Sequence, residues 1–300
     1  METSINPNAK TAAISQSENG EFRRLAQIIV DAVEVEKIIC FGSVCHHVVT
    51  KNCFGDLPAE CNVKRNSYSL LVIPSANRPL AQSIVQRQVE EACAPVAEVT
   101  AIVHTMEEVN AALRCGSGFF TAVCSKGILI HDNGTSPFAA PDADAPVSKR
   151  SMRREEFWNK WHGLAQGFLQ GAVFFHNNGL LRLAVYLLHQ AVQHCYCGVL
   201  RVTVGYRTNA QNLNRLIRLI DTSAPNLSLA PPRHSAEDMR LAEVLCKGYS
   251  DARYRDSFEV SEEQVAGLIT RVSQIVNTAD RTCRLRLQQL KDGKAAPATE

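Results

Sequence analysis

The sequence predicts two domains of different class: an N-terminal α/β domain with a small mixed sheet covered by helices, and a C-terminal up-and-down helical bundle. In the first half, short apolar runs alternate with amphipathic segments, whereas segments of the second half follow the 3.6-residue helical period. Between them lies a stretch of prolines with small and acidic residues, which is typical of a linker. The predicted parts are a disordered tail (1–20), the α/β domain (21–134), the linker (135–150), the helical domain (151–290) and a tail (291–300).

Composition excludes several classes of protein. The chain is 45% hydrophobic and 21% charged, as in soluble globular proteins, and its net charge of +2 is too small to indicate bulk nucleic-acid binding. It has neither an apolar run long enough to span a bilayer nor an N-terminal signal pattern, so we expect a cytoplasmic protein without membrane contact. The 11 cysteines include no CxxC pair, and we expect buried small hydrophobes rather than disulfides.

The α/β domain is predicted from an alternation of apolar runs and amphipathic segments. Its first helix follows from the spacing of Phe22, Leu25 and Ile29, and its strands are continuous apolar runs. The expected helices are 21–32, 80–94, 106–113 and 119–123, and the expected strands are 35–40, 67–73, 96–104 and 127–131.

The helical domain is predicted from long apolar stripes and helix caps. Ser151 is a candidate N-cap for a helix that ends near Asn177, and Gly205 fits the end of a helix that starts near Gly179. Another helix follows from about residue 209. Ser235 and Ser261 each precede a further helix, and the last helix reaches about residue 290.

The helix from Gly179 to Gly205 carries a second, polar row beside its apolar stripe. Arg182, Tyr186, His189 and Gln193 are spaced by four, three and four residues, so they line one face. A histidine on such a face can act as a general acid or base, and an arginine can stabilise a developing phosphorane charge. The alternative is a histidine hydrogen-bonded at a helix interface.

The same helix and its surroundings resemble the centre of a HEPN domain, over about residues 151–290. The resemblance implies a homodimer formed through the long helices. In some members an arginine and a histidine with four to six residues between them cut RNA, and Arg182 and His189, with six residues between them, satisfy that spacing. Leu183 follows the arginine where a polar residue is usual, and Ala210-Gln211 replaces the usual Thr-His. The residues that carry the resemblance are Ala184, Leu188, His189, Gln190, Ala191, Gly205, Tyr206, Arg207, Asn212 and Leu213.

The first half is similar to minimal nucleotidyltransferases of the polymerase-β type, which begin with a strand, Phe-Gly-Ser and a second strand. The resemblance implies that Gly42 and Ser43 form a turn that grips a triphosphate. The family's metal-binding Asp-x-Asp is replaced here by Ser67-Tyr68-Ser69, and Glu98 or Thr100 stands in the region of the third carboxylate. A hydroxyl cannot replace a carboxylate as an anchor for Mg²⁺. We therefore expect no nucleotidyl transfer and no cofactor, with Mg²⁺ required only if this site is active.

Two further groups of residues are candidates for binding. Tyr206, Arg207, Arg253 and Tyr254 offer aromatic and guanidinium groups for bases and phosphates, or for internal packing. Gly42, Ser43, Ser67 and Ser69 are the candidates for a nucleotide in the first domain. Zinc remains an open alternative for the Cys/His-rich stretch that contains Cys40, Cys45, His46, His47, Cys53 and Cys61.

These observations favour a non-catalytic nucleotide- or RNA-binding protein of the kind linked to toxin–antitoxin or stress functions. Two alternatives stay open. One is an active enzyme, either a HEPN ribonuclease that uses Arg182 and His189 or a residual nucleotidyltransferase. The other is a scaffold that dimerises through its helical domain.

Overall fold

The fold was analysed in a computed structural model that describes residues 16–44, 50–52, 66–76, 80–141, 147–208, 210–223 and 235–292. The chain divides between Ala145 and Pro146 into two compact units. The first is a mixed α/β unit and the second is helical, as predicted. Among the described helices, none combines the length and apolar character needed to cross a membrane.

The first unit is built on a five-stranded mixed sheet with β1 at its centre. β1 is antiparallel to β3 on one side and to β2 and β5 on the other, while β3 is parallel to β4. Because paired residues share a face, the register Gly42↔Ser69 and Ser69↔Thr100 places these three positions on one face of the sheet. The strands are β1 (Val35–Val44), β2 (Thr50–Asn52), β3 (Ser67–Pro74), β4 (Glu98–Val103) and β5 (Ile128–Asp132).

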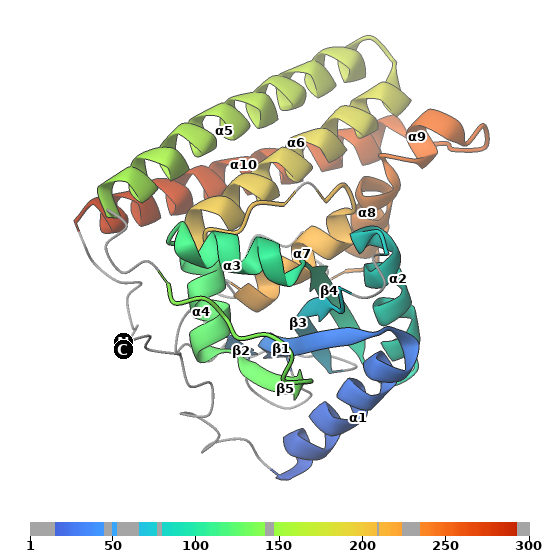
Figure 1. The fold of residues 1–300 in the computed structure, drawn as a ribbon. Coiled ribbons are helices and arrows are strands. Elements are labelled where there is room, and N and C mark those ends of the chain that lie inside the picture. The colour runs from blue at the N-terminus through green and yellow to red at the C-terminus, as the bar shows by residue number, and fades with distance from the viewer. Residues whose placement is uncertain are drawn as a thin grey trace. The chain divides into compact units, whose positions relative to one another are not determined.

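Two helices cover the apolar face of this sheet. The apolar sides of α1 (Gln16–Ala32) and α2 (Gln82–Cys93) pack with alternate residues of the strands, and the core includes Leu25, Val85 and Leu70 (Figure 1). α3 (Met106–Arg114) and α4 (Gly118–Lys126) follow β4. Phe119 of α4 packs edge to face on Phe41, with ring centroids 5.7 Å apart.

The second unit is a helical bundle in which α5, α6 and α10 run side by side (Figure 1). Trp158 of α5 and Tyr196 of α6 are fully buried among its largest core side chains. α6 is buried along most of its length, as its broad apolar stripe predicts. The helices are α5 (Val147–Asn177), α6 (Leu181–Thr203), α7 (Leu213–Ser223), α8 (Ala236–Lys247), α9 (Asp251–Tyr254) and α10 (Glu262–Lys291).

Helix ends agree with the sequence at most positions. Gly205 has a φ of 83°, as expected after α6, and both Ser235 and Ser261 form complete capping boxes. The prediction of Ser151 as an N-cap is wrong, because α5 already begins at Val147. In the sequence Val147 follows Pro146, and proline is favoured at a helix start because it has no N–H to leave unpaired.

The structure shows no disulfide among the described cysteines. Most behave as small hydrophobes of the two cores, and burial raises the pKa of the Cys93 thiol to about 11 and that of Cys124 to about 12. Cysteines with such thiols are unreactive at neutral pH. The buried ones are Cys40, Cys93, Cys124, Cys195, Cys197 and Cys283.

Candidate functional site

The polar row of α6 faces the segment formed by the end of α8 and the short helix α9. Arg182 and His189 both hydrogen-bond main-chain carbonyls of this segment, and Tyr186 lies between them on the same helix face. Gln193 continues the row and donates to the carbonyl of Ala210, with an N–O distance of 3.3 Å. The predicted row is therefore present, and it holds the surrounding chain against α6.

His189 is enclosed within the helical unit, with 1% of its surface exposed. Its Nδ1 lies 2.9 Å from the carbonyl oxygen of Leu245, and its Nε2 lies 3.1 Å from that of Gln211. Burial lowers the pKa of His189, while the two carbonyls favour the protonated ring and oppose that shift. Because both ring nitrogens face main-chain acceptors, His189 links the end of α8 to the loop before α7.

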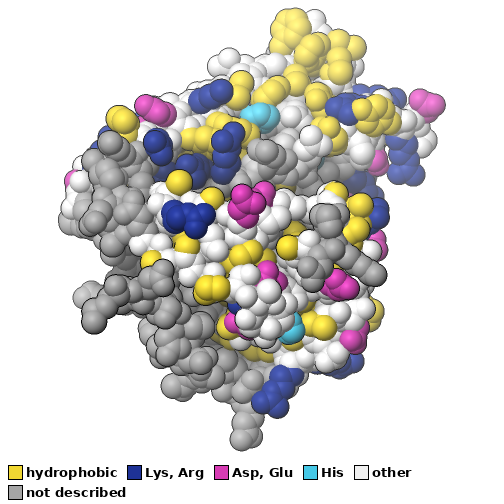
Figure 2. Space-filling model, in the orientation of Figure 1, with side chains coloured by type: hydrophobic (Ala, Val, Ile, Leu, Met, Phe, Trp, Pro, Cys, Tyr) yellow, Lys and Arg dark blue, Asp and Glu magenta, His cyan; other side chains and the backbone are white. Residues whose placement is uncertain are grey.

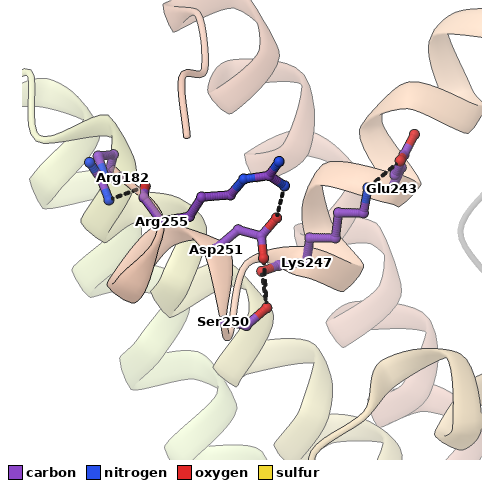
Figure 3. Close-up of polar contacts among 6 residues, drawn as sticks. All are labelled: Arg182, Glu243, Lys247, Ser250, Asp251 and Arg255. Carbon is purple, nitrogen blue, oxygen red and sulfur yellow. Dashed lines mark hydrogen bonds and ion pairs between the residues drawn. The ribbon is translucent and has the colours of Figure 1, made fainter. Parts of the chain in front are cut away.

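Arg182 holds α9 in place from the first turn of α6 (Figure 3). Its Nη2 donates to the carbonyl of Arg255 at 2.9 Å, and its Nε donates to that of Ala252 at 3.3 Å. α9 is also tied within itself, because Asp251 accepts from Ser250 at 2.8 Å and pairs with Arg255 at 3.3 Å. Arg182 therefore ties α9 and Arg255, the residue after it, to α6.

Arg253 is exposed and lies at the centre of a group of tyrosines, of which Tyr254 is exposed and Tyr186 and Tyr249 are half-buried. We name Tyr186, Tyr249, Arg253 and Tyr254 the aromatic–arginine cluster. The guanidinium carbon lies 4.4 Å from the ring centroids of both Tyr249 and Tyr254, and 5.4 Å from that of Tyr186. A hydrogen bond with Tyr186 is the main cause that raises the pKa of Arg253. Tyr254 is 72% exposed. The cluster therefore presents aromatic faces and a permanent positive charge together at the surface.

The structure separates the four predicted binding residues of this unit into two pairs. Arg253 and Tyr254 join the aromatic–arginine cluster at the start of α6, whereas Tyr206 and Arg207 follow its end. Tyr206 is buried and Arg207 is exposed. Tyr186 and Tyr249 were not predicted as binding residues. The sequence does contain a signal for Tyr249, because it lies four residues before Arg253, a spacing at which side chains can contact each other.

The nucleotide-binding turn predicted in the first unit is not a turn. Gly42 and Ser43 lie inside β1 and pair with Ser69 and Tyr68 of β3, so their main-chain groups belong to the sheet. Ser43, Ser67 and Ser69 are buried. The Oγ of Ser69 has no hydrogen-bond partner among the described residues.

The residues on this sheet face do not fit a two-metal site. Ser67 is paired with Glu98 and Ser69 with Thr100, so the face carries one carboxylate at these positions. Within the described ranges, no group of three or more His, Cys, Asp and Glu side chains is arranged to hold a metal ion. Hard cations such as Mg²⁺ are bound mainly through carboxylates, and one carboxylate supplies too few ligands to hold two of them.

The zinc hypothesis concerns residues that fall mostly outside the described part of the chain. Cys45, His46, His47, Cys53 and Cys61 lie there. Cys40 is buried in β1, and its thiol donates to the carbonyl of Gly42 at 3.4 Å. This cysteine thus has a structural role in the strand.

Comparison with protein families assigns the helical unit. Residues 158–282 match the family described as the HEPN domain. The helical unit contains a HEPN domain. The crystal structure of an archaeal HEPN homologue is also similar, with 18% sequence identity over 42% of this chain and 97% of that one, and a TM-score of 0.31. No curated protein matches the chain.

Proposed function

We propose that the HEPN unit binds single-stranded RNA at the aromatic–arginine cluster and does not cleave it. The observation that carries this proposal is the exposed guanidinium of Arg253, which lies 4.4 Å from the rings of both Tyr249 and Tyr254. Unstacked bases bind to aromatic faces and to guanidinium planes, and phosphates accept hydrogen bonds from arginine. HEPN domains often bind or cut RNA and occur in toxin–antitoxin systems, which favours RNA over a free nucleotide.

Absence of cleavage is proposed from the position of His189. A general base must come within hydrogen-bond reach of the 2′-hydroxyl that it deprotonates. The ring of His189 is buried, and each of its nitrogens already faces a carbonyl oxygen. Arg182 is likewise engaged, with the carbonyls of Ala252 and Arg255. In this proposal both residues position α8 and α9. Arg253 and Tyr254 belong to α9, and Tyr249 lies between the two helices.

We infer further that the first unit is a degenerate nucleotidyltransferase-like domain that transfers no nucleotide. The inference is supported by the serines that occupy the Asp-x-Asp positions of β3 and by the extended pairing of Gly42-Ser43. It predicts that incubation with Mg²⁺ and a labelled nucleoside triphosphate transfers no label to the protein or to added RNA.

The RNA-binding proposal is tested by fluorescence anisotropy with a labelled single-stranded oligouridylate and the full-length protein. Tyr254→Ala should weaken binding by about 5- to 150-fold, because stacking of one base contributes about 1–3 kcal/mol. Tyr254→Phe keeps the aromatic face and is the matched control, so its affinity should be close to wild type. Equal affinities of the wild type and Tyr254→Ala would contradict the proposed site.

A further inference from the structure

A second cationic surface lies at the other end of α6. The guanidinium of Arg154, near the start of α5, donates to the carbonyl of Val202 at 2.9 Å, which joins the first turns of α5 to the last turn of α6. Arg201 donates to the carbonyl of Gly205 at 2.8 Å. Arg153 precedes Arg154 in the sequence, Arg207 follows two residues after Gly205, and both arginines are exposed. We name Arg153, Arg201 and Arg207 the basic cluster.

The basic cluster has an excess of positive charge. Within the described ranges, none of its three arginines forms an ion pair with a carboxylate. Partial burial, followed by the positive charges of Arg207 and Arg153, lowers the pKa of Arg201. The three guanidinium groups therefore repel one another. Figure 2 shows Lys and Arg side chains gathered over α5 and α6 toward the end where α5 begins.

The start of α5 adds to this positive potential. Its first turn contains no acidic residue, although acidic side chains stabilise the positive end of a helix dipole. Arg153 and Arg154 follow in the next turn. The positive end of the α5 dipole repels these positive side chains, which lowers the stability of the helix start. A bound anion would offset this repulsion.

We propose that Arg153, Arg201 and Arg207 bind phosphates of a single-stranded RNA backbone, as a second contact for the RNA held at the aromatic–arginine cluster. This inference rests on the proposed function. The side chain of Arg201 is half-buried, with its Nε enclosed and one Nη donating to Gly205, so its contact with a phosphate would be made through the other Nη. Arg207 and Arg153 are exposed, so their guanidinium groups are accessible to a phosphate.

The two surfaces are far enough apart to be tested separately. Tyr186 and Arg201 belong to the same helix, and at about 1.5 Å per residue they are separated by about 22 Å along its axis. Stacking at the tyrosines depends little on ionic strength, whereas each phosphate neutralised by an arginine releases counterions. Salt dependence therefore distinguishes the two surfaces.

The test measures the affinity of the full-length protein for a labelled oligouridylate across a series of KCl concentrations. For single strands, log K falls with log salt, and each phosphate contact adds about 0.7 to the steepness of that fall. In the double variant Arg153→Gln/Arg207→Gln the slope should therefore be shallower by about 1.4. Arg240→Gln is the matched control, because Arg240 is 69% exposed on α8. Tyr254→Ala should lower affinity at every salt concentration and leave the slope unchanged.

The outcomes separate the two proposals. A shallower slope for the double variant supports the basic cluster, provided that the variant keeps the melting temperature of the wild type. RNA binding whose slope is the same in the double variant and in Arg240→Gln overturns the basic cluster and leaves the aromatic–arginine cluster standing. A wild-type protein that binds no oligouridylate at low salt overturns both.

Discussion

At the scale of single residues, His189 shows how a catalytic pattern can have a structural role. A neutral imidazole has one N–H, so it donates to either Leu245 or Gln211, and both acceptors lie within hydrogen-bond distance. Tyr249 packs beside the ring, with centroids 5.7 Å apart. The side chain thus supports the segment that presents Arg253.

Replacement of His189 by alanine is expected to lower the free energy of unfolding by about 1–3 kcal/mol, because a buried main-chain carbonyl loses the ring N–H that donates to it. Urea unfolding followed by circular dichroism measures this change. Tyr254→Ala is the control and should leave stability unchanged, since that side chain is 72% exposed. An unchanged stability of His189→Ala would contradict the structural role.

The pH dependence of stability gives a second prediction for this residue. Burial lowers the pKa of His189 below its ordinary value of 6.5, so below about pH 6.5 the unfolded chain binds a proton that the folded chain does not. The free energy of unfolding should therefore fall as the pH decreases from about 7 to 5. His189→Gln should show a shallower fall over that range. His162, whose pKa burial also lowers, remains in both proteins.

The arrangement and the contacts of the candidate site residues were only partly predictable from the sequence. The row of Arg182, Tyr186, His189 and Gln193 follows from helical spacing alone, and the structure confirms it. The carbonyl partners of His189 belong to distant segments, so no local pattern indicates them. The turn expected at Gly42-Ser43 is a strand, because its conformation depends on pairing with β3 rather than on those two residues.

At the scale of elements, close packing of α5 on α6 depends on the absence of a side chain at Gly198. A Cβ at this position would lie 2.9 Å from ring atoms of Trp158. The Trp158 ring is buried, and its Nε1 donates to Asp280 of α10 at 3.1 Å, so it cannot move away freely. One glycine therefore lets three helices meet around one tryptophan.

Gly198→Ala is expected to destabilise the protein by about 1–3 kcal/mol, the usual cost of overpacking a core. Gly163→Ala on α5 is the matched control, because a Cβ there would meet nothing within 4 Å. This control should raise stability by about 0.5–1 kcal/mol, since alanine favours a helix more than glycine does. Thermal unfolding measures the stability of both variants. Equal changes in stability would contradict the close packing of Gly198 against Trp158.

Elements were more predictable than sites. The strand at 67–73 and the helices opened by Ser235 and Ser261 follow from apolar runs and caps, and the structure reproduces them closely. The short strand β2 and the helix α9 were not predicted. Each is too short to show a periodic pattern, and α9 is held by Arg182 from another helix.

At the scale of the whole molecule, we expect a homodimer that forms through the helical unit. Apolar side chains are exposed where α5 turns into α6, among them Phe174 (62%), Leu180 (48%) and Leu183 (45%). Figure 2 shows hydrophobic side chains gathered at this tip. Contiguous exposed apolar surface of this kind is typical of an interface between proteins.

Light scattering of the full-length protein tests this expectation. The wild type should have the mass of a dimer, and Phe174→Asp should have that of a monomer with an unchanged melting temperature, because a charge at the contact would be desolvated. Met239→Asp is the control, since Met239 is 54% exposed on α8. A wild type that stays monomeric at high concentration would contradict the dimer.

We propose that the HEPN unit holds RNA through Arg253 and its tyrosines, while Arg182 and His189 stabilise the fold. To test this, end-labelled single-stranded RNA is incubated with the full-length wild type, and complex formation and RNA length are followed in the same samples. We expect a complex that contains intact RNA. Shortened products that disappear in His189→Ala, with the melting temperature of that variant unchanged, would contradict it and make His189 a catalytic residue.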